Sequence, residues 1–208
     1  MIFNKDNMTI LFIGDSITDC GRDRSNPEHL GGGYPSIIAE KLRQKYVKKE
    51  FRFLNLGISG NSVLDLQKRW ESDCIAFNPD IVSILVGIND VWRRYDSNSP
   101  VSKDDFYNTY KNILTQTKKE TDAKIIMMEP FLMINSDKNH FREDLDPKIM
   151  AVRELALEFA VQYIPLDGMF ASLCCANKNT VYSEDGIHPT DIAAQAMSKA
   201  WLNHTLKV

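Results

Sequence analysis

Serine, histidine and aspartate side chains with spacing suited to nucleophilic catalysis lie near the two ends of this 208-residue sequence. Ser16 lies three residues after the end of an apolar run, so a turn there could project its hydroxyl outward, and Asp185 lies three residues before His188. A serine hydroxyl becomes an effective nucleophile when a base takes its proton, and a third group has to hold the base in the correct tautomer. The three residues could therefore form a catalytic triad. Taken singly, Ser16 is more typical of a helix N-cap, and Asp185 and His188 are typical of a turn before a helix.

Two further residues could stabilise the negative charge that develops on a substrate carbonyl. Gly60 can donate its backbone N–H at the start of a helix expected near Ser62, where helix-end amides favour an anion. Asn89 can donate from its side-chain amide. Each residue also has a plainer interpretation, Gly60 as a turn glycine and Asn89 as a loop cap. Their positions directly after expected strands favour a role in one shared site.

The elements that would position these residues alternate between strands and helices. Five apolar runs of strand length are expected as strands, at residues 9–13, 51–56, 81–86, 124–128 and 163–166. Segments of helical period lie between them, at residues 34–47, 63–77, 102–121 and about 147–160, and a final helix is expected to open at Pro189. Continuously apolar strands are typical of parallel sheets covered on both faces. The pattern predicts an α/β fold, a three-layer doubly wound five-stranded parallel sheet in flavodoxin-like order, with residues 1–208 forming one domain.

Four polar, glycine-bearing segments follow the expected strand ends. They are residues 14–16, 57–61, 87–90 and, beyond the last strand, 185–189. In doubly wound sheets, ligands bind beyond the carboxyl ends of the strands. The four segments are therefore predicted to converge on one rim of the sheet.

Together these segments resemble the sequence blocks of the SGNH (GDSL-type) hydrolases. Gly14-Asp-Ser-Ile-Thr18 resembles the first block, and the remaining blocks are matched in order by Gly60, by Gly87-x-Asn89-Asp90 and by Asp185-x-x-His188-Pro189. The matches extend across nearly the whole chain, and four motifs in register are far more specific than any one of them.

The resemblance implies a role for each matching residue. Ser16 would be the nucleophile, His188 the base and Asp185 the residue that orients it. The backbone N–H groups of Ser16 and Gly60 and the side chain of Asn89 would form the oxyanion hole. No cofactor is implied for this serine esterase chemistry, which proceeds through an acyl-enzyme intermediate.

A narrower resemblance concerns the substrate. Residues 11–22 and 87–93 are similar to the intracellular bacterial acetylxylan esterases, which deacetylate xylo-oligosaccharides. This implies hydrolysis of short-chain acetyl esters on carbohydrates, with Asp15, Tyr34 and Trp92 as candidate substrate-binding residues. Tyr34 and Trp92 would suit a sugar-facing rim because carbohydrate rings pack on aromatic faces, although either aromatic is about as typical of the core.

Two other functions stay open on the sequence alone. A lysophospholipase- or thioesterase-like acyl hydrolase would share the fold and triad but would need an apolar acyl channel. A non-catalytic flavodoxin-like binding module would depend on the glycines at 31–33, which no G-K-[ST] follows. The sequence contains no G-x-S-x-G elbow, which disfavours an ordinary α/β-hydrolase.

Composition and charge exclude several classes of partner. The net charge of −3, from 25 basic and 28 acidic residues, creates no field that would collect nucleic acid or an anionic membrane surface. The N-terminal apolar run at residues 8–13 is too short for a bilayer span or a signal peptide, so a cytoplasmic location is expected. The four cysteines are expected to be free thiols, and no spacing of histidines and acids predicts a metal site. The expected partner is a small-molecule ester, and both a monomer and a homo-oligomer are compatible with the sequence.

Overall fold

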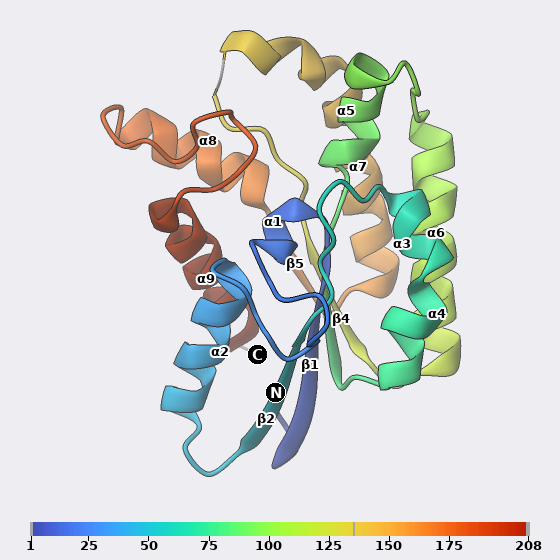
Figure 1. Cartoon of the computed structure of the whole chain (residues 1–208), viewed down its shortest axis with the longest axis vertical. Helices are drawn as coiled ribbons and strands as arrows, with labels where there is room; N and C mark the ends of the chain where they lie inside the picture. Colours follow the sequence, from blue (N-terminus) through green and yellow to red (C-terminus); the bar gives the residue numbers. More distant parts are fainter. Residues whose placement is uncertain (1, 135, 207–208) are drawn as a thin grey trace.

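The sheet that positions the site is parallel throughout. In the computed structural model, which describes residues 2–134 and 136–206, five strands pair in the order β2-β1-β3-β4-β5 (Figure 1). The strands are β1 (Asn7–Gly14), β2 (Glu50–Asn55), β3 (Ile81–Leu85), β4 (Lys124–Met128) and β5 (Gln162–Ile164). This order confirms the predicted doubly wound α/β fold of the flavodoxin type.

Helices cover both faces of the sheet. One layer contains α2 (Tyr34–Lys45), α8 (Leu166–Ala176) and α9 (Asp191–Leu206), and the other contains α3 (Val63–Lys68), α4 (Trp70–Asp73), α6 (Lys103–Glu120) and α7 (Arg142–Phe159) (Figure 1). Helices α1 (Ser16–Asp19) and α5 (Ile88–Asp96) directly follow the carboxyl ends of β1 and β3. Two short 3₁₀ helices, η1 (Ile75–Phe77) and η2 (Ser136–Phe141), complete the elements of the described residues.

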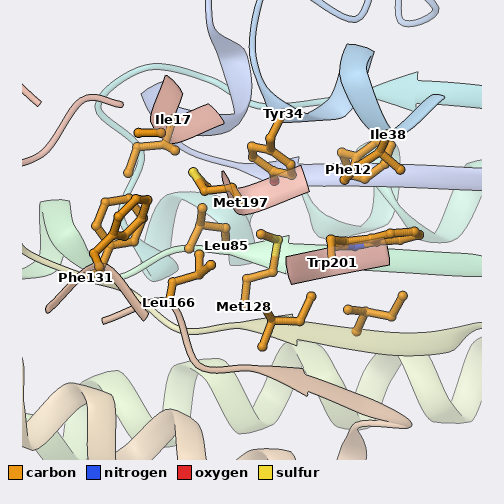
Figure 2. Close-up of a cluster of buried hydrophobic side chains, with 14 of the residues drawn as sticks. Phe12, Ile17, Tyr34, Ile38, Leu85, Met128, Phe131, Leu166, Met197 and Trp201 are labelled. Atoms are coloured by element: carbon orange, nitrogen blue, oxygen red, sulfur yellow. The ribbon is translucent and has the colours of Figure 1, made fainter. Parts of the chain in front are cut away.

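The interior strand β1 shows why the sequence forms a covered parallel sheet. Ile10 and Phe12 belong to the core beneath α2 and α9, whereas Leu11 and Ile13 belong to the core beneath α3 and α6. All four side chains are fully buried. Figure 2 shows the first of these cores, in which the rings of Phe12 and Trp201 lie 5.9 Å apart. Because successive side chains point to opposite faces, a strand that is apolar at every position has to be covered on both sides.

The helix predicted over residues 63–77 is divided into α3, α4 and η1. The first break lies at Arg69, whose backbone leaves helical geometry at φ −114° and ψ 9°. Its guanidinium donates to the carbonyls of Gly14 (3.2 Å) and Leu56 (2.8 Å), which lie at the ends of β1 and β2. A side chain that holds two strand ends together thus interrupts an otherwise helical apolar pattern.

Other element boundaries also differ from the predicted ones. Helix α7 begins at Arg142, so Pro147, the predicted start, lies inside the helix. Helix α9 begins at Asp191 and not at Pro189, and the carbonyl of Thr190 accepts a hydrogen bond from the N–H of Ala194 at 2.8 Å. The sequence pattern misses α5 and α8 altogether, since polar turn residues open the first and a predicted strand overlaps the start of the second.

Candidate active site

The loops at the carboxyl ends of β1, β2 and β3 meet the turn that precedes α9. Ser16 follows β1, Gly60 follows β2 and Asn89 follows β3, and with His188 they line one pocket of about 320 Å³. Parallel strands bring them together because neighbouring strands end at the same edge of the sheet. The structure thus places the four sequence segments on one rim.

Ser16, His188 and Asp185 form a continuous hydrogen-bonded chain of side chains. Oγ of Ser16 lies 2.9 Å from Nε2 of His188, and Nδ1 of the same ring lies 2.7 Å from Oδ2 of Asp185. Since a carboxylate can only accept, the proton of the neutral ring resides on Nδ1, and Nε2 presents its lone pair to the serine hydroxyl. The geometry is suited to removing the proton from Ser16.

The carboxylate of Asp185 is fixed by its own turn. Its Oδ1 accepts hydrogen bonds from the backbone N–H groups of His188 (2.8 Å) and Ile187 (2.9 Å) and from Oγ of Ser183 (3.0 Å). Gly186 supplies the left-handed backbone that the turn requires, with φ +83°. Burial alone would raise the pKa of Asp185, but the hydrogen bonds from His188 and Ile187 outweigh it and hold the pKa below its usual range. Asp185 therefore remains a carboxylate.

Two residues that follow β4 in the chain hold this turn through hydrogen bonds to its backbone carbonyls. The N–H of Met133 donates to the carbonyl of Gly186 at 2.8 Å, and Nζ of Lys138 donates to the carbonyl of Asp185 at 2.9 Å. Sequence reasoning missed both, because each contacts main-chain atoms that any residue would provide. It also missed Ser183, whose spacing of two residues before Asp185 is the one local signal that could have indicated it.

The turn after β1 presents Ser16 at the start of α1. Gly14 is required there, since a Cβ at this position would lie 2.1 Å from the carbonyl oxygen of Leu85 and 2.7 Å from Oγ1 of Thr18. Asp15 is the N-cap and accepts from the N–H of Ile17 at 3.0 Å. The close approach of β3 therefore sets the sharp turn that exposes the serine hydroxyl.

The location of Asp15 corrects one expectation. Its side chain was predicted to bind substrate, but only 1% of the residue is exposed, because it lies beneath the nucleophile as a helix cap. Burial raises the pKa of Asp15 to about 7, and the hydrogen bond from Ile17 and the charge of His188 oppose that rise. Its Oδ2 has no hydrogen-bond partner among the described residues. Asp15 is thus an ionisable group under the site and does not contact the substrate pocket.

Gly60 and Asn89 supply the donors predicted for an oxyanion hole. Gly60 has φ +85° and lies two residues before Ser62, the N-cap of α3. Asn89 lies in the first turn of α5 and is 5% exposed, and its side-chain amide donates to the carbonyl of Asn61 at 3.1 Å. An amide group carries two protons, so one N–H of Asn89 is left for a ligand in the pocket.

The two aromatic candidates have different surroundings. Trp92 is partly buried and lines the pocket that contains Ser16, and its ring lies 6.2 Å from that of His188. Tyr34 is 1% exposed, and its hydroxyl is 2.9 Å from Oγ1 of Thr18. Helix α2 begins at Tyr34 and turns its ring into the core (Figure 2), although the residue also borders a pocket that contains Ser16 and His188. Its ring therefore offers little surface on which a sugar could pack, and a substrate contact of Tyr34 stays a prediction.

A second, more apolar pocket adjoins Ser16 and His188. It has a volume of about 390 Å³, and its lining includes the side chains of Ile17, Pro189 and Met197. The nucleophile and base therefore lie between a polar pocket with the oxyanion donors and an apolar pocket beside α9.

The described residues form no recognisable metal-binding site. Among residues 2–134 and 136–206, no three histidine, cysteine, aspartate or glutamate side chains are grouped closely enough to hold one. The cysteines at 20, 74, 174 and 175 are free thiols, as predicted. In the same part of the chain, no helix is both long and apolar enough to cross a membrane.

Comparison with known families and proteins finds similarity over nearly the whole chain. The GDSL-like Lipase/Acylhydrolase family matches residues 12–196. An acetylxylan esterase of Geobacillus stearothermophilus is 35% identical over 201 residues, which cover 93% of this chain and 91% of that protein. An acetylxylan esterase of Xylanibacter ruminicola is 25% identical, and the match covers 94% of this chain but 42% of that protein.

Solved structures are similar over the same extent. The crystal structure of Axe2, an acetylxylan esterase from Geobacillus stearothermophilus, has a TM-score of 0.85 and 35% sequence identity, covering 94% of this chain and 93% of that one. LAE5, an alpha/beta hydrolase from the metagenome of Lake Arreo in Spain, has a TM-score of 0.85 and 26% identity, with 94% of each chain covered. Structures of catalytic mutants of Axe2 changed at a serine, a histidine or an aspartate also match.

Proposed function

Because this chain belongs to the GDSL-like lipase/acylhydrolase family and is a carboxylic ester hydrolase, we propose that it removes acetyl groups from carbohydrates such as acetylated xylo-oligosaccharides. The proposed catalytic groups are Ser16, His188 and Asp185. The observation that carries this proposal is the unbroken chain of contacts from Oγ of Ser16 through the His188 ring to Oδ2 of Asp185, at 2.9 and 2.7 Å.

In the acylation step, Oγ of Ser16 attacks the ester carbonyl carbon while Nε2 of His188 takes its proton. The resulting imidazolium is stabilised by the adjacent carboxylate of Asp185, 2.7 Å from Nδ1. Collapse of the tetrahedral intermediate breaks the bond to the alcohol oxygen, which receives the proton from Nε2. The products of this step are the free alcohol and an acetyl ester on Ser16.

The negative charge on the carbonyl oxygen has three candidate donors. They are the backbone N–H groups of Ser16 and Gly60 and the side-chain amide of Asn89. Donors fixed before the reaction stabilise the transition state without reorganising, and loss of one such donor typically lowers kcat by roughly 100- to 1000-fold. Both Gly60 and Asn89 belong to segments held by several hydrogen bonds, which favours this role.

Deacylation repeats the same proton transfers with water. His188 takes a proton from a water molecule, whose oxygen attacks the acyl carbon to form a second tetrahedral intermediate. Its collapse breaks the bond between the acyl carbon and Oγ of Ser16, and Oγ receives the proton from Nε2. Acetic acid leaves and ionises to acetate, and the enzyme is restored. Because 48% of the His188 side chain is exposed, water has access to the base once the alcohol has left.

The alcohol of the substrate is expected in the polar pocket. Trp92 is partly exposed there, with Nζ of Lys138 5.5 Å from its ring centroid, and carbohydrate rings pack on aromatic faces. The similarity to acetylxylan esterases supports a sugar as the alcohol. Trp92 is therefore the proposed contact for the sugar ring.

One observation favours a second candidate, a hydrolase of longer acyl esters. The apolar pocket of about 390 Å³ beside Ser16 is much larger than an acetyl group requires. A rate series over p-nitrophenyl esters from acetyl to octanoyl, measured beside acetylated xylo-oligosaccharides, separates the two. A steep fall in kcat/KM beyond propionyl would support the acetyl esterase, and octanoyl as the better substrate would support the alternative.

The nucleophile is tested by labelling. A serine-directed phosphonate should modify the wild-type enzyme at Ser16, and Ser16→Ala should be neither labelled nor active while it keeps the wild-type melting temperature. Ser59 is the matched control, because it lines both pockets beside Ser16. Labelling at Ser59, with Ser16→Ala still active, would overturn the assignment.

A further inference from the structure

Helix α5 is hydrogen-bonded to the loop that contains Gly60. Three hydrogen bonds link the helix to residues 60–63, termed here the Gly60 loop: Arg93 Nη2 to the Gly60 carbonyl (3.1 Å), Asn89 Nδ2 to the Asn61 carbonyl (3.1 Å) and the Val63 N–H to the Asp90 carboxylate (3.1 Å). One helix thus carries the side-chain donor of the oxyanion hole and also anchors the loop that provides a backbone donor.

Gly60 needs such an anchor more than other residues. It has no Cβ and lies at φ +85°, so its backbone has more freedom than that of any other residue type. On one side, the N–H of Ser59 is held by Oδ2 of Asp19 at 3.0 Å. On the other side, the carbonyl of Gly60 is held by Arg93. The peptide that bears the Gly60 N–H therefore lies between two fixed points.

Arg93 packs directly against this glycine. A Cβ built on Gly60 would lie 3.1 Å from Nη2 of Arg93. Among the described residues, the guanidinium is the one group that donates to the Gly60 carbonyl, and its other nitrogen, Nη1, forms an ion pair with Asp96. Loss of the guanidinium would free one side of the Gly60 peptide without removing any donor of the oxyanion hole.

We infer that Arg93 is a positioning residue of the oxyanion hole, which keeps the Gly60 N–H aligned with the substrate carbonyl oxygen by holding the Gly60 carbonyl. The inference depends on the proposed function and names a further residue for it. A misplacement of about 1 Å at a reacting group can lower the rate roughly 100-fold. The loss should fall on kcat, because the oxyanion forms only in the transition state.

The test compares Arg93→Met with Arg94→Met. Both arginines belong to α5, their side chains are 38% and 39% exposed, and each forms an ion pair, but Arg94 pairs with Asp144 and does not contact the Gly60 loop. Arg93→Met should lower kcat roughly 10- to 100-fold, whereas Arg94→Met should stay close to the wild type. Arg93→Lys keeps the charge and a donor, so it should recover part of the loss.

Two readouts separate positioning from substrate binding, since Arg93 also lines the polar pocket. Turnover of p-nitrophenyl acetate and of an acetylated xylo-oligosaccharide should fall by the same factor, because the two esters share the acetyl carbonyl and differ in the alcohol. Phenylboronic acid, which forms a tetrahedral adduct with the serine, should bind more weakly in parallel with kcat. A rise in KM for the sugar substrate alone would show that Arg93 binds the alcohol and would overturn the inference.

A double-mutant cycle gives a second criterion. If Arg93 and Asn89 serve the same oxyanion, the combined variant should lose less than the product of the single losses. Fully multiplicative losses would contradict the inference. Failure of the proposed function itself is recognised separately, because the wild-type enzyme would then not hydrolyse acetyl esters and Ser16→Ala would be silent.

Discussion

Asp185→Asn is the most informative change, because it replaces one carboxylate oxygen by nitrogen in a turn whose hydrogen bonds determine which way the new amide faces. Three donors converge on Oδ1, from Ser183, Ile187 and His188, so the oxygen of the new amide has to occupy that position. The amide nitrogen is then forced against Nδ1 of His188. Reversing the amide would set its N–H₂ against three donors and leave hydrogen bonds unmade at about 1 kcal/mol each.

The expected loss follows from two effects on the ring of His188. The reactive tautomer would place its Nδ1–H against another N–H, so that its hydrogen bond to a charged acceptor is lost at about 2 kcal/mol. The imidazolium formed during attack would lose a charge-assisted hydrogen bond worth a further ~2–3 kcal/mol. The sum of about 4–5 kcal/mol corresponds to a fall in kcat of roughly 10³- to 10⁴-fold at 1.36 kcal/mol per decade. The same exchange in the serine-protease template lowers kcat about 10⁴-fold.

The assay is kcat for p-nitrophenyl acetate together with the melting temperature. Asparagine caps a turn nearly as well as aspartate, so the melting temperature near neutral pH should change little. Ser183→Ala is the matched control, because it removes one donor to Oδ1 while the carboxylate still faces Nδ1; its kcat should fall less than about 10-fold. Near-wild-type turnover of Asp185→Asn would refute the reasoning and leave Ser16 and His188 acting as a dyad.

Three further outcomes are expected. Asn89→Ala should lower kcat roughly 100- to 1000-fold with little change in KM, and a loss of affinity alone would remove Asn89 from the oxyanion hole. The pKa of Asp15 is raised from 3.8 to about 7 in the folded protein, so the wild type is most stable at low pH and loses stability as pH rises through 7. Because asparagine does not ionise, Asp15→Asn should gain stability relative to the wild type between pH 4.5 and 7.5 in urea unfolding. A difference in the free energy of unfolding that stays constant with pH would contradict this. Trp92→Ala should raise KM for xylo-oligosaccharides roughly 3- to 10-fold, about 1 kcal/mol of aromatic contact, and leave p-nitrophenyl acetate nearly unchanged; equal effects on both substrates would argue against stacking.

The sheet and its order could be predicted from the sequence because local patterns carry that information. Five apolar runs alternate with helical periods, and parallel strands buried on both faces have to be apolar at every position, as in β1. The rim that holds the site follows from the same topology, since the polar segments after β1, β2 and β3 end at one edge of the sheet. That residues 1–208 form one domain stays a prediction.

The boundaries of the helices could not be predicted with the same success, because tertiary contacts determine where a helix begins and ends. The guanidinium of Arg69 reaches two strand ends and divides the helix expected over residues 63–77. No local spacing encodes contacts of this kind.

The residues of the candidate site also fall into two groups, those that the sequence indicates and those whose surroundings depend on tertiary packing. The order of the motifs and their resemblance to the SGNH hydrolases indicate Ser16, Gly60, Asn89, Asp185 and His188, although each has a plainer interpretation when it is taken alone. The burial of Asp15 and Tyr34 depended on where β3 and α2 pack, and only the tertiary structure decided it. The supporting contacts to the Asp185 turn and the Gly60 loop join segments far apart in the chain and end on backbone carbonyls. Every residue has a backbone carbonyl, so the sequence does not indicate to which carbonyl a distant lysine or arginine will donate.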